Sequence, residues 1–441
     1  MEFTLNFIII ILSFIPGYYL GVFRFKRLNY YCVLYWSMLL FCVIGSFIIN
    51  SGVMDDSFFV EPIANNAEVK NLGLFITTIS FFIFFLSTFI VEVFCSLYSG
   101  QSSVMIHWNN YYSRPIIMSS YKVVLTLCIL SCALVFYYIV SIYPAPLSMA
   151  LQGASADEIA VRRLEVTKNY SGIGYFKTLA GIIPIILSYY CFISYLKFKK
   201  HFLLFIFITC ISTLTLAING EKAPLVFYFL GLLVSYSSVR EITKKIYVFS
   251  AFLIFSLILI MYVVLFQFDN SDYLLYILVE RLFIAQEAAV FYAADYFSTH
   301  NLLGLSSMDT IFNKILSITP TARASEIFMY QYLPGMAENG GWNVNGFFAH
   351  ETFSNFGYIG IVLGSMYGGI VNGLLCIYFR AREKTVLTMS FYSFYSFYVV
   401  SVTTVLSSFN SMLFNTQLIL VFIIFLILSV LDRRRKHAVP E

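Results

Sequence analysis

The sequence predicts an all-α, polytopic integral membrane protein with about eleven transmembrane helices, within a range of ten to twelve. Of its 441 residues, 60% are hydrophobic and only 11% are charged, whereas soluble globular chains carry roughly 25% charged residues. Apolar runs long enough to cross a hydrocarbon core recur along the whole chain. Strands of a membrane barrel would alternate in polarity, but the run 248–266 is apolar throughout, so helices are expected.

Polar turns separate the apolar runs and set the expected helix boundaries. The first run follows Met1 and Glu2 with no basic segment and no cleavage site, so we expect it to remain as a helix. No soluble segment is large enough to stand alone, and residues 1–441 are expected to form a single transmembrane domain. The expected helices cover residues 3–22, 31–50, 72–91, 122–143, 176–196, 202–218, 223–239, 246–266, 352–379, 386–406 and 416–431.

Charged residues predict the orientation of these helices. One set of alternate loops, together with the C-terminal tail, holds 18 of the 27 Lys and Arg but only 5 of the 23 Asp and Glu. Basic loops lie on the cytoplasmic side by the positive-inside rule, so the N-terminus is expected outside and the C-terminus in the cytoplasm. The net charge of +4 is therefore the sum of a basic inner face and an acidic outer face, and it does not indicate nucleic-acid binding.

Two outer segments are long enough to carry function. Residues 144–177 form one extracytoplasmic loop, and residues 267–351 form a larger one between the eighth and ninth helices. Within the larger loop, residues 273–297 have the character of an amphipathic helix, whose apolar faces either lie on the membrane surface or pack on the bundle. The eight cysteines lie in or beside apolar runs, which favours packing over a disulfide framework.

The motifs that are missing limit the chemistry. The sequence has no GxxxxGK[ST] phosphate loop, no HExxH, no Asp-x-Asp and no GxSxG. The five histidines are scattered, and no pair has the spacing of metal ligands. We therefore expect no ATP-driven step, no metal and no cofactor, and any catalysis has to use scattered acids, bases and one or two histidines at the outer face.

Two short motifs place cations near the outer face. In the turn Asn219-Gly-Glu-Lys-Ala-Pro224, Lys222 either snorkels to the interface or contacts an anion. Arg281 has apolar neighbours and needs a partner, which is either Glu280 in a structural ion pair or a ligand phosphate.

Two further motifs combine aromatic and titratable residues. Residues 320–342 contain Arg323, Glu326, aromatic side chains and a Gly-Gly turn, which suit sugar rings, although an interfacial aromatic belt has the same composition. At the start of the ninth helix, His350 could move a proton near neutral pH, and Glu351 either acts with it or only caps the helix. Glycines at fourfold spacing follow, from Gly360 onward, and predict close helix packing.

These features together resemble the Wzy-type O-antigen polymerases, the oligosaccharide repeat-unit polymerases of Gram-negative bacteria. The turn at residues 219–224, the large outer loop before the third-last helix and the segment 350–360 carry the resemblance. Similar proteins often have a Gly-x-Arg-Gly-like turn, where Lys222 here keeps the charge but loses bidentate geometry. Their acidic residue followed by Asn-Phe-Gly and Gly is matched by Glu351, Asn355, Phe356, Gly357 and Gly360. The odd number of expected helices departs from the even number often described for the family.

The resemblance implies metal-independent glycosyl transfer in the bacterial inner membrane. A glycan on undecaprenyl diphosphate would move to a hydroxyl of a new lipid-linked repeat unit. His350 or Glu351 would be the base, and cations would neutralise the leaving diphosphate. The expected partners are the lipid-linked oligosaccharide, membrane lipid and a chain-length regulator protein. The residues expected to bind the diphosphate or the sugar are Lys222, Arg281, Arg323, Arg162, Arg163, Glu326 and Asn355.

Two alternatives stay open on the sequence. The related O-antigen ligase shares the large outer loop before late helices, so the layout does not separate it from a polymerase. A transporter or flippase for the lipid-linked sugar would be expected to have inverted repeats, broken helices and midplane charges. The expected helices are largely free of charge, which argues against transport.

Overall fold

The computed structural model describes residues 2–98, 104–168, 170–219, 223–266, 274–308, 313, 315–338, 343–400, 403 and 416–433. These residues form helices and connecting turns, with an isolated parallel bridge between Ile117 and Thr385 and no longer strand among them. The all-helical fold class is therefore confirmed.

The helices of the first half include one π-helical segment, η1, and one 3-10 turn, η2. The elements are α1 (Glu2–Leu20), α2 (Tyr30–Ser37), η1 (Met38–Val43), α3 (Ile44–Ser51), η2 (Glu61–Ile63), α4 (Ala67–Tyr98), α5 (Val104–Ser113), α6 (Tyr121–Ser141), α7 (Pro146–Leu151), α8 (Ala156–Lys168), α9 (Gly174–Phe198) and α10 (Phe202–Ala217).

The second half contains a further π-helical segment, η3, inside the predicted large outer loop. The elements are α11 (Ala223–Val239), α12 (Lys244–Phe266), α13 (Leu274–Val279), η3 (Glu280–Ile284), α14 (Ala288–Thr299), α16 (Ala324–Tyr332), α17 (Pro334–Glu338), α18 (Ala349–Ala381), α19 (Val386–Val400) and α21 (Thr416–Arg433).

Six of the described helices are long and apolar enough to cross a membrane, which indicates a membrane-embedded protein. They are Phe3–Leu20, Tyr30–Ser51, Ala67–Tyr98, Tyr121–Ser141, Gly174–Phe198 and Ala349–Ala381. Three shorter apolar helices, Phe202–Ala217, Ala223–Val239 and Leu418–Asp432, accompany them. A helix occupies each of the eleven expected ranges, but six candidate spans do not establish eleven crossings, and that number stays a prediction.

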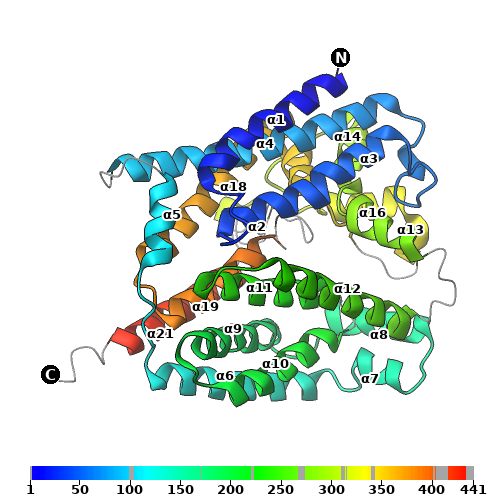
Figure 1. The fold of residues 1–441 in the computed structure, drawn as a ribbon. Coiled ribbons are helices and arrows are strands. Elements are labelled where there is room, and N and C mark those ends of the chain that lie inside the picture. Colours follow the sequence, from blue (N-terminus) through cyan, green and yellow to red (C-terminus); the bar gives the residue numbers. More distant parts are fainter. Residues whose placement is uncertain are drawn as a thin grey trace.

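Two groups of helices make up the molecule, as Figure 1 shows. One group contains α1, α4, α14 and α18, and the other contains α6, α9, α10 and α11. In the first group α18 lies against α4, where a Cβ added to Gly369 would be 2.3 Å from the Phe84 carbonyl oxygen. Only glycine permits that approach, so the predicted packing face of the ninth expected helix is confirmed.

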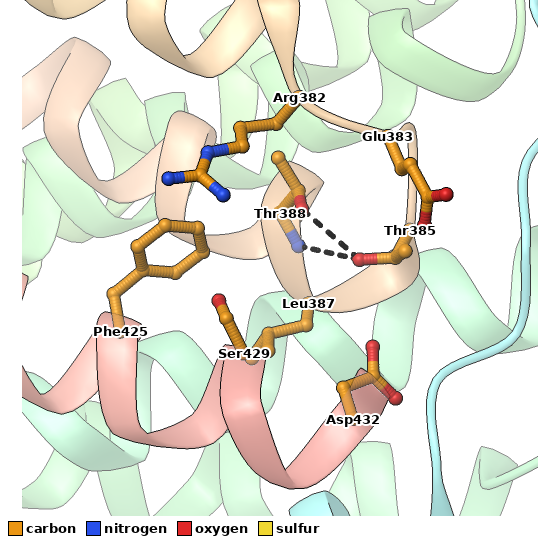
Figure 2. A pocket seen from close by; sticks show the side chains of 8 residues that line it. All are labelled: Arg382, Glu383, Thr385, Leu387, Thr388, Phe425, Ser429 and Asp432. Carbon is orange, nitrogen blue, oxygen red and sulfur yellow. Dashed lines mark hydrogen bonds between the residues drawn. The ribbon is translucent and has the colours of Figure 1, made fainter. Parts of the chain in front are cut away.

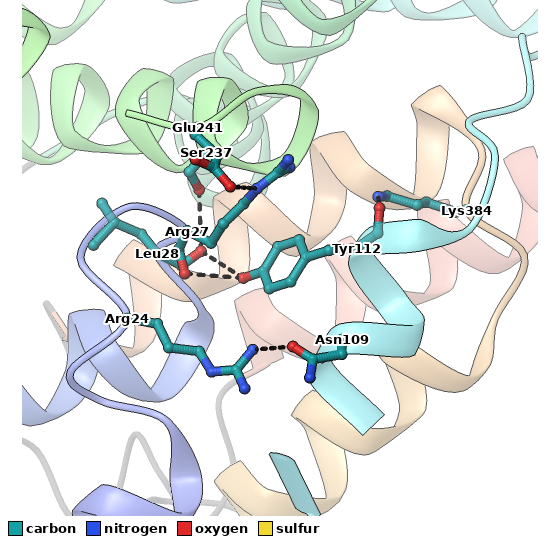
Figure 3. Close-up of polar contacts among 8 residues, drawn as sticks. All are labelled: Arg24, Arg27, Leu28, Asn109, Tyr112, Ser237, Glu241 and Lys384. Atoms are coloured by element: carbon teal, nitrogen blue, oxygen red, sulfur yellow. Dashed lines mark hydrogen bonds and ion pairs between the residues drawn. The ribbon is translucent and has the colours of Figure 1, made fainter. Parts of the chain in front are cut away.

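Four of the loops predicted to be basic, at residues 24–28, 109–117, 237–245 and 380–386, lie together on one side of the bundle, which we call the basic face; Figure 3 shows residues from them. Arg24 donates to Asn109 at 2.9 Å, and Lys384 donates to the carbonyl of Tyr112 at 3.3 Å. Backbone hydrogen bonds join Ile242 to Lys26 and Ile117 to Lys384. The prediction that these loops share a side is therefore confirmed, while the cytoplasmic location of that side stays a prediction.

Candidate functional site

The predicted amphipathic helix of the large outer loop is a broken and buried segment. It divides into α13, η3 and α14, and every residue from Ala288 to Ala294 is buried. Helix α14 packs on α4 and α18, and a Cβ added to Gly73 would lie 2.5 Å from the Phe291 ring. The sequence left two positions open for this segment, on the membrane surface or against the helix bundle, and the structure shows α14 packed against the bundle. The apolar residues of α14 are used in this packing, while Leu282 of η3 is exposed.

Helix α16 adds an aromatic cluster against α14. Its centre is Phe328, and the cluster consists of Tyr292, Tyr296, Phe297, Phe328, Tyr332 and His350. The rings of Tyr292 and Tyr332 stack with centroids 4.4 Å apart, and the Tyr332 hydroxyl donates to Asp295 at 2.6 Å. Burial, with the Asp295 carboxylate next in effect, raises the pKa of Tyr332 above its usual value.

The start of α18 is bent at a glycine. Gly357 has φ +60° and ψ −142°, which side chains other than glycine rarely adopt. A Cβ added to Gly360 would lie 2.0 Å from the Thr352 carbonyl oxygen, so the bend also requires this second glycine. The N–H groups of Leu303 and Gly304 donate to the carbonyls of residues 354 and 355 at the bend. The two motif glycines thus have a backbone role.

His350 lies in the short helical part before this bend and is fully buried. Its Nδ1 lies 2.8 Å from the carbonyl oxygen of Phe347. A carbonyl only accepts hydrogen bonds, so Nδ1 carries a hydrogen, and in the neutral ring Nε2 then carries the lone pair. Among the described residues Nε2 has no partner. A buried, unpaired nitrogen of this kind can accept a proton from a substrate hydroxyl brought to it.

The two other motif residues at the start of α18 are also buried. Glu351 is 3% exposed, one turn before Asn355. The side-chain oxygen of Asn355 accepts from the Ser307 hydroxyl at 2.6 Å, and its amide nitrogen has no partner among the described residues. The observed contact ties the loop at residues 303–307 to the helix bend. A substrate-binding role for Asn355 stays a prediction.

Two of the predicted cations are unpaired within the described part of the chain. Arg281 is exposed, with its guanidinium 5.2 Å above the Phe59 ring. The alternative of an ion pair with Glu280 is wrong, because Glu280 accepts from the Ser57 hydroxyl at 2.7 Å instead. Arg323 is the N-cap residue of α16, and its half-buried side chain makes no ion pair there.

The remaining predicted residues are placed less favourably. Arg162 on α8 donates to the carbonyls of residues 142–144 and to Glu165, so its guanidinium has a structural role. Arg163 is half-buried on the same helix. Lys222 lies outside the described residues. Glu326 is half-buried in the first turn of α16.

The structure brings one subset of the predicted residues together. The N–H of Val344 donates to the carbonyl of Ser325, which joins the segment before His350 to the α16 turn carrying Arg323 and Glu326. Arg281 lies at the other end of the α13–α14 segment, while α8 with its two arginines packs on α7. The aromatic segment of residues 320–342 was recognisable in the sequence, but Asp295 and Phe328 were not. Asp295 is 37 residues from its partner Tyr332, and the partners of Phe328 lie in α14, α16 and α18, in no recognisable motif.

A shallow recess lies elsewhere, on the basic face (Figure 2). Residues from the turn after α18, from α19 and from α21 line it, and Thr385 hydrogen-bonds to Thr388 inside the turn. It contains none of the predicted site residues. Within the described ranges, no group of three His, Cys, Asp or Glu side chains is arranged to hold a metal ion.

Comparisons of this chain with protein-family models, with curated proteins and with solved structures gave no match. The functional argument therefore rests on the residues of the chain itself.

Proposed function

We propose that the protein is a membrane glycosyltransferase that polymerises oligosaccharide repeat units carried on undecaprenyl diphosphate. The observation that supports this most is the position of His350, whose Nδ1 faces the Phe347 carbonyl and whose buried Nε2 is unpaired among the described residues. A histidine held in one tautomer by a backbone carbonyl is the arrangement a general base requires.

In the proposed reaction, the hydroxyl of the incoming unit attacks the anomeric carbon of the donor glycan. The bond between that carbon and the diphosphate oxygen breaks, and the hydroxyl proton passes to Nε2 of His350. The charge that develops on the diphosphate needs cations. Arg323, on the α16 turn that is joined to the segment before His350, makes no ion pair among the described residues, which supports this role, while Arg281 lies in η3 and stays a prediction. No metal and no nucleotide cofactor takes part.

The aromatic cluster supports a sugar as the substrate. Sugar rings present C–H faces that stack on aromatic rings, while their hydroxyls bond to carboxylates. Tyr332 supplies an aromatic ring and Asp295 a carboxylate, and the two are hydrogen-bonded to each other. They lie beside Phe328, whose ring packs near that of His350. The outer face as the reaction side, and the bacterial inner membrane as the location, belong to the same proposal.

The test is polymer formation by the purified full-length protein, given lipid-linked repeat units and no metal or nucleotide. We expect polymer from the natural chain and at least about a hundredfold less from His350→Ala, the usual range for a lost general base. Phe353→Leu, one turn along the same short helix, serves as the folding control. Polymer of unchanged length from both His350→Ala and Glu351→Gln would remove the base assignment.

The same preparation separates the alternatives. A ligase would transfer a single finished glycan to a lipid A-core acceptor and would leave the repeat units unjoined. A flippase would move lipid-linked sugar across liposomes without forming any glycosidic bond. The bend in α18 is a feature that a transporter would share, and the unpaired base beside it favours the polymerase.

A further inference from the structure

A second buried acid lies outside the proposed site. Glu287 follows η3 at the start of α14 and is fully buried. Its Oε1 shares a hydrogen bond with the Thr77 hydroxyl, and it lies beside the Cys42 thiol. Its Oε2 has no partner among the described residues. No step of the proposed transfer uses this carboxyl.

No cation of the elements around Glu287 is paired with it within the described part of the chain. The segment Tyr30–Ser51 contains no Asp, Glu, Lys or Arg, and Cys42 is its titratable group at this position. The charged groups of α4, η3 and α14 face other partners or solvent. They are exposed Glu68, Lys70 with Asp55, Glu92 with Arg380, Glu280 with Ser57, Arg281 over Phe59, and Asp295 with Tyr332.

Glu287 also lies between two distorted helices. Cys42 belongs to the π-helical segment η1, and Glu287 follows the π-helical segment η3, which packs on η1 and α3. Gly45 makes this contact possible, because a Cβ there would lie 2.5 Å from the Phe283 carbonyl oxygen. Single π-helical turns inside α-helices are frequent at functional positions, and here two of them flank one acid.

The hydrogen bonds favour a neutral carboxyl. Thr77 has one hydroxyl hydrogen but two acceptors within reach, Glu287 Oε1 and the Gly73 carbonyl at 3.1 Å. Both are satisfied when the acid donates to the Thr77 oxygen and Thr77 donates to the carbonyl one turn back, as threonines in helices commonly do. An ionised carboxylate would take the Thr77 hydroxyl hydrogen away from the Gly73 carbonyl, and it would be buried without a counter-ion among the described residues, which costs several kcal/mol.

We propose that Glu287 is a proton-binding site inside the helix bundle and carries its proton at neutral pH. Losing the proton would draw water or a small cation to the carboxylate, and the close contact of η3 with η1 and α3 would have to open. Ala289, two residues further on, touches Gly346, which precedes the His350 helix. The ligand is a proton, and its release would be transmitted along α14 toward the candidate site. This inference does not depend on the identity of the transfer reaction.

Infrared difference spectroscopy of the full-length protein in lipid nanodiscs at pH 7 tests the proposal. The spectrum of the natural chain minus that of Glu287→Gln should contain the C=O stretching band of a neutral carboxylic acid. Glutamine mimics the neutral acid in shape, so the variant is expected to fold. Carboxylate bands in place of the acid band would overturn the proposal. Conversion of the acid band to carboxylate bands by added NaCl would also overturn it, in favour of a cation site.

Thermal unfolding provides an independent readout. A neutral acid tolerates replacement by its amide, so Glu287→Gln should unfold at or above the temperature of the natural chain at pH 7. Glu92→Gln is the matched comparison, because Glu92 is equally buried but bonded to Arg380. A loss of stability in Glu287→Gln as large as that in Glu92→Gln would show that Glu287 is ionised and would refute the inference.

Discussion

The buried ion pair between Glu92 on α4 and Arg380 at the end of α18 gives the sharpest stability prediction. The two side chains are 0% and 5% exposed, and Arg380 Nη2 lies 2.6 Å from Glu92 Oε2. The Tyr31 hydroxyl donates to the other carboxylate oxygen at 2.6 Å, and the guanidinium lies 5.0 Å from the centre of the Trp108 ring. In Glu92→Gln the guanidinium would stay charged, buried and without an anion.

Removing one partner of a buried pair costs about 3–5 kcal/mol, because the other charge stays desolvated. Burial of both groups here places the expected loss of stability in that range. Thermal unfolding of the detergent-purified protein, followed by tryptophan fluorescence, measures it, and Trp108 reports on the position directly. We expect Glu92→Gln to unfold several degrees below the natural chain.

The control removes both charges. Glu92→Leu combined with Arg380→Met should recover most of the lost stability, since apolar side chains of similar volume often replace a buried ion pair at little cost. An unfolding temperature of Glu92→Gln equal to that of the natural chain would refute the argument. So would a double variant less stable than the single one, because packing rather than the unpaired charge would then dominate.

Three other predictions concern glycine contacts and pH. Gly369→Ala should destabilise the chain by about 1–3 kcal/mol by forcing α18 off α4, while Gly181→Ala, with no atom near the added Cβ, should be neutral in the same melting assay. Gly357→Ala should destabilise the chain by about 1–3 kcal/mol through backbone strain. It should also shorten the polymer made in a complemented null strain. An unchanged polymer length would contradict a role for the bend. Burial, with neighbouring basic groups, lowers the pKa of Lys384 to about 8. In the unfolded chain the pKa of a lysine is about 10.4, so between pH 8 and that value the unfolded state binds more protons at Lys384 than the folded state does. The free energy of unfolding should therefore rise with pH across this window, and Lys384→Met should flatten the rise. Equal slopes of stability against pH for the natural chain and the variant would refute the prediction.

The positions of the long apolar helices were predictable because hydropathy decides them, whereas the helices outside the apolar runs, α5, α7, α8, α16 and α17, were not among the expected ranges. Each apolar run expected from the sequence contains a helix, and counting charges placed the loops of the basic face together. These properties depend on local composition, which the sequence displays directly. The depth of α14 was not predictable in this way. Its run of Ala288–Ala294 has small and aromatic residues that fit a membrane surface as well as a protein interior, and only Gly73 opposite Phe291 decides between them.

The candidate site was predictable in its residue types but not in its connections. The motif at residues 350–360 pointed to His350, yet the tautomer that makes it a base depends on the Phe347 carbonyl and on the fold of the chain around it. Glu287 was recognisable only as one of the charges within the apolar segment 273–297, with no sign of its environment. Its lack of a counter-ion is a property of three packed elements, one of them more than 200 residues earlier in the chain. A single sequence carries no record of such long-range absences.

The backbone hydrogen bonds of the basic face have a consequence for how the molecule can move. The Ile117 N–H donates to Lys384, Val386 donates back to Ile117, and Ile242 donates to Lys26, so loops far apart in sequence are fastened at one end of the bundle. These bonds hold the connected helices together at the basic face. A helix lengthens by about 1.5 Å per residue, so a small rotation at the basic face produces a larger displacement toward the other end of each helix. Under the proposed function, a lipid-linked glycan would enter at the end of the bundle away from the basic face.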